Sequence, residues 1–158
     1  MNRFIRFPEA QKWQSISHKF HAKRGFPGVI GCVDGAHIPV LVPKSDRSET
    51  YRNRKGFMSL NVQMVCGPKE EIYDIVAGWP GSAHDAVIWT TSDISSRMSD
   101  GMLSRNFHLL GDSAYPLSSY LLTPFKSPTS RAESNFSFTY FLKIQRFTIT
   151  NTLPQECA

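Results

Sequence analysis

The stretch GVIGCVDGAHIPVLVP, residues 28–43, constrains the fold more than any other, because it places a carboxylate inside an apolar run. The β-branched residues around Asp34 predict a buried strand over residues 28–42. A buried carboxylate is costly unless it is paired or bound to a metal ion. Asp34 is therefore either a functional group in the core or a strand-end carboxylate that caps a turn with Gly35, which is common turn chemistry.

Two further segments predict a β-hairpin. Residues 60–66 carry apolar side chains at Leu60, Val62 and Met64, and residues 72–77 form a second apolar run. The turn GPKEE between them is short, so the two strands are expected to pair antiparallel.

The next elements complete an α/β pattern. A helix is expected over residues 82–100, with Ser82 as its N-cap and Asp85 at the acidic position of a capping box. A fourth strand over residues 107–110 is followed by Asp112, and LSSYLLTPF is a short helix or an extended piece. This order predicts a mixed sheet in which the first and fourth strands are neighbours.

The N-terminal 27 residues predict a helical entry segment. Trp13, Ile16 and Phe20 are spaced as on one face of an amphipathic helix, and Gly25 and Pro27 end it. The expected organisation is this segment, a catalytic-type domain over residues 28–138, and a divergent tail over residues 139–158.

Composition limits the function classes. The 158 residues amount to about one domain and contain 18 Lys and Arg against 13 Asp and Glu, a net charge of +5 that favours a polyanionic partner. The three cysteines form no CxxC pair, which argues against a zinc knuckle or a disulfide framework. No run approaches the ~20 apolar residues of a membrane span, so we expect a soluble intracellular protein.

Asp34 and Asp112 together predict a cation site. If their strands are neighbours, the two carboxylates point into one cleft and repel, and one stays protonated unless a cation intervenes. Mg²⁺ binds through one or two protein carboxylates with water and phosphate oxygens, and paired ions support phosphodiester cleavage. The alternative for Asp112, as for Asp34, is a turn cap, here with Ser113.

Four ordered motifs carry a family resemblance. GCVDGAHI, YRNRKGFMSLNVQMVC, GWPGSAHDAVIW and LLGDSAYPLSSYLLTPF, across residues 31–125, resemble the DDE superfamily endonuclease domain of PIF/Harbinger transposases and their domesticated nuclease relatives. The resemblance implies a ribonuclease-H-like fold in which two aspartates and a glutamate bind Mg²⁺ or Mn²⁺ and cut DNA. Asp34 and Asp112 match the first two acidic residues. DNA, a Myb/SANT-like DNA-binding partner and a nuclear location, with the cytoplasm as an additional one, are also implied.

Two other motifs have more than one interpretation. His84 and Asp85 match a motif typical of the family, and they either contact the metal ligands or the substrate, bind metal directly, or only support the helix. Arg52, Arg54 and Lys55 lie in one loop and either contact DNA phosphates or form a solvated loop. Of the remaining histidines, only one, in VDGAHI, is close in sequence to Asp34.

The resemblance breaks where the third acidic residue belongs. After AESNF the family continues into a helix with that glutamate, but no acidic residue occurs here between Glu133 and Glu156. We therefore expect a nuclease domain that is incomplete at its C-terminus and impaired in cleavage. The alternatives are a catalytically inactive, domesticated fragment that binds DNA or protein, and a fragment without a stable fold.

Overall fold

The computed structural model describes residues 5–42, 45 and 47–135. The labelled elements are, in chain order, α1 Ala10–Arg24, β1 Val29–Pro39, the 3₁₀ turn η1 Ser48–Tyr51, β2 Ser59–Cys66, β3 Ile72–Pro80, α2 Asp85–Thr90, α3 Asp93–Ser99, β4 His108–Leu110 and β5 Leu121–Leu122.

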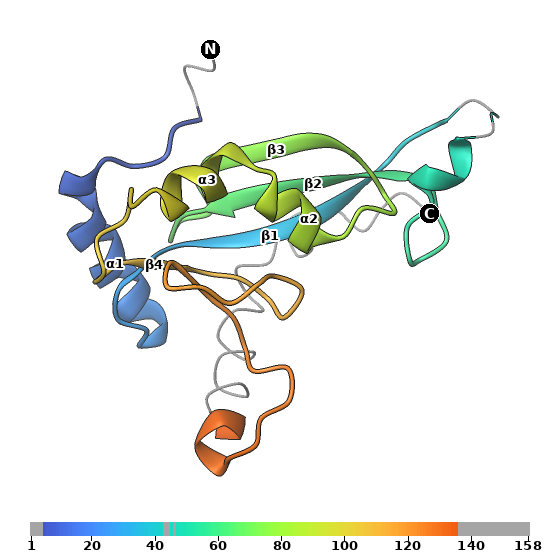
Figure 1. Cartoon of the computed structure of the whole chain (residues 1–158). Helices are drawn as coiled ribbons and strands as arrows, with labels where there is room; N and C mark the ends of the chain where they lie inside the picture. The colour runs from blue at the N-terminus through green and yellow to red at the C-terminus, as the bar shows by residue number, and fades with distance from the viewer. Residues whose placement is uncertain (1–4, 43–44, 46, 136–158) are drawn as a thin grey trace.

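The five strands form one mixed sheet in the order β3-β2-β1-β4-β5. β1 pairs antiparallel with β2, and β2 with β3, whereas β1 and β4, and β4 and β5, run parallel. Helices α2 and α3 lie over the sheet, and α1 lies near the end of β1 and β4 (Figure 1). The α/β class, the antiparallel hairpin and the β1–β4 pairing are confirmed, and the topology is that of the ribonuclease-H-like fold.

The amphipathic N-terminal helix is confirmed. Trp13, Ile16 and Phe20 are buried in the main core against β1 and β4. Gly25 ends the helix in the left-handed conformation, with φ 72°, where glycine lacks the steric cost of a Cβ. None of the described helices is long and apolar enough to cross a membrane.

The predicted helix over residues 82–100 is two helices, α2 and α3. Thr91 Oγ1 donates to the carbonyl of Val87 at 2.8 Å, and Ser92 Oγ donates to that of Trp89 at 2.7 Å. Such side-chain bonds to the backbone compete with helix continuation. Ser92 then caps α3 by accepting the N–H of Ser95, so a new helix begins where the prediction had one continue.

The predicted N-cap at Ser82 was wrong, and the structure decides between the two conformations left open for LSSYLLTPF. The N-cap of α2 is His84, not Ser82. Ser82 belongs to the turn before the helix, where its backbone N–H donates to the carbonyl of Thr50 in η1 at 3.1 Å. The stretch LSSYLLTPF is extended rather than helical, and its Leu121 and Leu122 pair with Leu109 and Leu110 of β4.

A projecting loop joins β1 to β2 at the far end of the sheet (Figure 1). Val40 N donates to the carbonyl of Met58 at 3.0 Å, and the backbones of Arg52 and Met58 form an isolated antiparallel β-bridge. The chain therefore stays paired beyond the strands. This loop carries the basic segment singled out in the sequence.

Candidate active site

Asp34 and Asp112 lie on neighbouring parallel strands. In the β1–β4 register Cys32 faces Leu110, and each aspartate comes two residues after this pair. Both side chains are half-buried. Asp34 Oδ1 accepts the N–H of Gly35 at 2.9 Å, and Asp112 Oδ1 accepts that of Ala114 at 2.9 Å, so a backbone donor orients each carboxylate.

The surroundings of Asp112 disfavour its negative charge. Burial raises the pKa of this carboxyl above its ordinary value, and the charge of Asp85 raises it further. The N–H of Ala114 and the charge of Lys126 act in the opposite direction but do not cancel the rise. The site therefore holds an excess of negative charge that a bound cation would offset.

Tyr115 lies among the same carboxylates and was missed in the sequence. It is 1% exposed, packs edge-on against Trp89 with ring centroids 6.2 Å apart, and its hydroxyl has no partner among the described residues. Burial raises the pKa of the hydroxyl, followed by the charges of Asp85, Asp34 and Asp112. All three aspartates are thus close enough to act on one phenol.

Asp85 is anchored to the sheet and does not act as a helix cap. Its Oδ1 accepts a hydrogen bond from Asn61 Nδ2 of β2 at 2.8 Å. A Cβ on Gly35 would lie 2.7 Å from the same oxygen, so only glycine at this position lets Asp85 come this close to β1. Gly35 therefore leaves the space that the Asp85 carboxylate occupies next to β1.

Asp34 and Asp85 approach β1 from opposite faces. Successive side chains of a strand alternate between faces, and the missing side chain of Gly35 points at Asp85. Asp34 instead shares its face with Cys32 and Cys66, whose thiol pKa values are raised by burial first and by the charge of Asp34 as a lesser cause. A shared ion between Asp34 and Asp85 is therefore not favoured by this geometry.

The donor set of Asp34 and Asp112 fits a divalent ion. Two carboxylates on adjacent strands suit Mg²⁺, which takes its other ligands from water and phosphate. No group of three or more His, Cys, Asp or Glu side chains among the described residues is arranged to hold one ion. Glu133 is committed elsewhere, since its carboxylate accepts the N–H of Thr129 at 2.6 Å. Glu156 and the segment expected to lack the third acidic residue lie outside the described residues.

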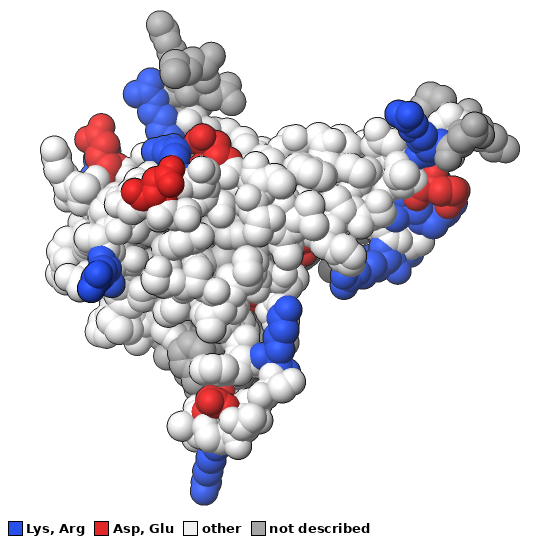
Figure 2. Space-filling model, viewed as in Figure 1, with Lys and Arg blue, Asp and Glu red and all other residues white. Residues whose placement is uncertain are grey.

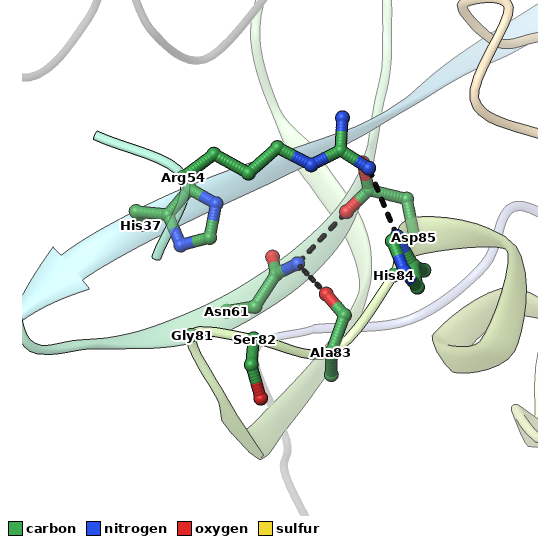
Figure 3. Close-up of a pocket in the computed structure, with 8 residues that line it drawn as sticks. All are labelled: His37, Arg54, Asn61, Gly81, Ser82, Ala83, His84 and Asp85. Carbon is green, nitrogen blue, oxygen red and sulfur yellow. Dashed lines mark hydrogen bonds between the residues drawn. The ribbon is translucent and has the colours of Figure 1, made fainter. Parts of the chain in front are cut away.

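A cavity of about 90 Å³ brings several predicted residues together (Figure 3). Arg54 Nη2 lies 2.9 Å from His84 Nδ1, and Asp85 forms another part of the wall. The lining also includes His37, which had been noted only for its position, and Asn61, which the sequence did not indicate.

The three predicted DNA-contacting residues differ in what they touch. Arg52 binds Glu49 through Nε and Nη2, at 2.7 and 2.9 Å, and donates Nη1 to the carbonyl of Gly56 at 2.7 Å. Arg54 faces the cavity, and Lys55 is exposed to solvent. Figure 2 shows basic side chains gathered at this loop. Arg52 is thus bound within the loop, whereas Arg54, which contacts His84, and the exposed Lys55 are better placed to meet a phosphate.

Comparison with known protein families points to the same part of the chain. The family described as DDE superfamily endonuclease matches residues 33–151, which include Asp34, Asp85 and Asp112. The chain belongs to this family. It is a DDE endonuclease domain of the transposase-derived nuclease type.

Its relatives confirm the Harbinger lineage. The protein named "Putative nuclease HARBI1" is 36% identical in Bos taurus and 35% in Homo sapiens, in each case over 140 residues that make up 88% of this chain and 40% of the relative. "Protein ALP1-like" of Arabidopsis thaliana is 31% identical over 140 residues, 80% of this chain and 34% of that protein. The chain thus spans about two fifths of the HARBI1 relatives. No solved structure matches this DDE domain significantly.

Proposed function

We propose that this DDE domain binds Mg²⁺ or Mn²⁺ through Asp34 and Asp112 and hydrolyses DNA phosphodiester bonds. The observation that carries the proposal is the pair of half-buried carboxylates two residues past the last β1–β4 pair, in a site where negative charge is in excess. A divalent ion bound there supplies Lewis-acid stabilisation of charge on the phosphodiester.

The chain's own residues hold this site in shape. The backbone donors at Gly35 and Ala114 fix the two carboxylates before any ion arrives. Asn61 holds Asp85 in place next to Gly35, on the other face of β1 from Asp34. The buried hydroxyl of Tyr115 lies within reach of the charges of all three aspartates. A site that is already oriented loses less entropy on binding.

A non-catalytic DNA-binding role is the second candidate. It is favoured by the finding that no group of three ligand-type side chains is set around one ion in the described part of the chain. Such a domain would keep the basic loop and a weak ion site but cut little. Under either proposal the work on DNA belongs in the nucleus, and the Myb/SANT-like partner stays a prediction from the resemblance.

The first test is calorimetric titration of Mn²⁺ into the wild type and Asp34→Asn, with plasmid nicking on the same samples. We expect the variant to bind Mn²⁺ at least 10–100-fold more weakly, because even the loss of a residue that only supports a metal ligand has an effect of about this size. Nicking in Mn²⁺ is expected for the wild type and not for the variant.

The outcomes separate the two candidate functions. Binding without nicking would favour the non-catalytic domain. Equal Mn²⁺ affinity in the wild type and Asp34→Asn would exclude Asp34 as a ligand. Asp93→Asn is the matched control, because Asp93 is exposed on α3, where it pairs with Arg97 at 3.7 Å.

The basic loop gives a second test. Arg54→Gln is expected to reduce the slope of log affinity against log salt for a random-sequence oligonucleotide by about one unit, as for one lost phosphate contact. Arg52→Gln is the matched control, because its guanidinium is bound to Glu49 and Gly56 within the loop. An unchanged slope in Arg54→Gln, measured by fluorescence anisotropy, would remove Arg54 from the interface.

A further inference from the structure

The cavity beside Asp85 contains a buried acceptor without a donor. Asn61 is 2% exposed, and its Nδ2 donates to the carbonyl of Ala83 at 3.1 Å and to Asp85 Oδ1 at 2.8 Å. These two bonds fix the orientation of the amide, so its Oδ1 cannot exchange places with the nitrogen. That oxygen has no partner among the described residues and faces the cavity (Figure 3).

A hydrogen-bond relay fixes the proton of His37. Asn53 Nδ2 donates to Ser59 Oγ at 3.0 Å, and Ser59 Oγ lies 3.0 Å from His37 Nδ1. Ser59 is fully buried, so its own hydroxyl proton needs an acceptor. His37 Nδ1 is the acceptor this arrangement offers, which leaves the proton of the neutral ring on Nε2.

His37 is also kept neutral by its surroundings. Burial lowers its pKa as the largest cause, the charge of Asp85 raises it, and the charges of Lys55 and Arg54 lower it. The ring nitrogen remote from Cβ, Nε2, faces the cavity in Figure 3. The cavity therefore presents an N–H donor from His37 and a carbonyl acceptor from Asn61, which are register partners on adjacent strands.

The mouth of the cavity is covered by a planar cation. The Arg54 side chain runs across it and is held by His84 at 2.9 Å (Figure 3). Guanidinium planes stack on aromatic faces and on nucleobases. The volume of about 90 Å³ is several times the roughly 10–15 Å³ that a cavity needs to hold one water molecule. This is room for one edge of a flat ring, with the rest of the ring lying beneath the guanidinium.

We propose that this cavity receives the Watson–Crick edge of one unpaired nucleobase of the DNA substrate. A donor of the base bonds to Asn61 Oδ1, and a neighbouring ring nitrogen accepts the Nε2–H of His37. A phosphate is disfavoured, because Asn61 Oδ1 and the Asp85 carboxylate would both face its oxygens. This assignment rests on the proposed action on DNA. It adds one claim, that the bound base lies outside a duplex, where its Watson–Crick edge is free.

The test pairs each protein group with one group of the base. Fluorescence anisotropy in EDTA measures binding of single-stranded oligodeoxyadenylate, of the same strand built from purine, which lacks the amine, and of the strand built from 1-deazaadenine, which lacks the ring acceptor. Each deletion is expected to weaken wild-type binding about fivefold, the size of one hydrogen bond. Asn61→Leu should lose only the amine dependence, and His37→Phe only the ring-nitrogen dependence.

The remaining outcomes overturn the proposal in distinguishable ways. Equal wild-type affinity for all three strands, or for an abasic strand of the same length, would show a site for the backbone and leave DNA binding intact. No binding of any strand would overturn this proposal together with the action on DNA. Nitrogen-15 NMR of the wild type tests the relay directly, and a proton on His37 Nδ1 at neutral pH would exclude it. If Asn61→Leu fails to fold, the His37→Phe variant and the NMR result still test the proposal that the cavity binds a base.

Discussion

Asp112→Asn is expected to give a protein that, without metal, melts at a higher temperature than the wild type but no longer gains stability from Mn²⁺. Asparagine keeps the Oδ1 that accepts the N–H of Ala114. It removes a charge that burial and the neighbouring Asp85 both disfavour. If the proposed ion site is correct, the unfavourable charge of Asp112 lowers the stability of the metal-free wild type and serves cation binding, a common relation between stability and function.

The pH dependence follows from the raised pKa of Asp112. When the folded pKa lies above the unfolded value of about 3.9, the carboxyl is protonated in both states at lower pH and has no effect on stability there. As the pH rises through the unfolded pKa and on to the folded pKa, the wild type loses stability, and the loss then stays constant. The advantage of Asp112→Asn in EDTA should therefore be absent in acid and present at neutral pH.

Added Mn²⁺ should reverse the order of the two proteins. At 100 times the dissociation constant a ligand stabilises the folded state by about 2.7 kcal/mol, and only the wild type gains this. The measurement is the melting temperature of each protein in EDTA and in Mn²⁺, at acid and at neutral pH. Asp100→Asn, on the exposed C-cap of α3, is the matched control. A lower melting temperature for Asp112→Asn than for the wild type in EDTA at neutral pH would contradict the account.

Strand β2 shows why part of the site could not be predicted from the sequence. Its alternation of Leu60, Val62 and Met64 with polar residues is typical of a strand whose polar side faces water. In the structure Asn61 and Gln63 are buried, at 2% and 1% exposure, whereas Leu60 and Met64 are only half-buried. The polar side faces α2 and the loop before it, and no local pattern encodes which face a later helix will cover.

The carboxylate pair shows the opposite case. Asp34 interrupts an apolar strand, and the cost of burying a charge is visible in the sequence alone. Its neighbour Asp112 follows from strand order, because a fourth strand beside the first brings the two together. The approach of Asp85 to Gly35 depends on a tertiary contact across the sheet, so the sequence indicated Asp85 only through its family motif.

Trp89→Ala is expected to destabilise the protein by about 3–5 kcal/mol, as large-to-small changes of buried aromatic residues do. Trp89 is 1% exposed in the main core and packs edge-on against Tyr115. The free energy of unfolding of a folded domain is about 5–15 kcal/mol in total, so the expected loss is a large fraction of it. Urea denaturation followed by circular dichroism gives the free energy of unfolding.

The same change should also weaken Mn²⁺ binding without touching a proposed ligand. Helix α2 has six residues, too few to be stable without packing, and Trp89 anchors it while Asp85 stands at its first position. Loss of the anchor frees Asp85 from its place beside Gly35 and removes the ring that packs on Tyr115. Val87→Ala, 45% exposed on the same helix, should change stability by no more than about 0.5 kcal/mol. If Val87→Ala and Trp89→Ala lost equal Mn²⁺ affinity, the effect would come from the helix as a whole, and the role given to the Trp89 anchor would be wrong.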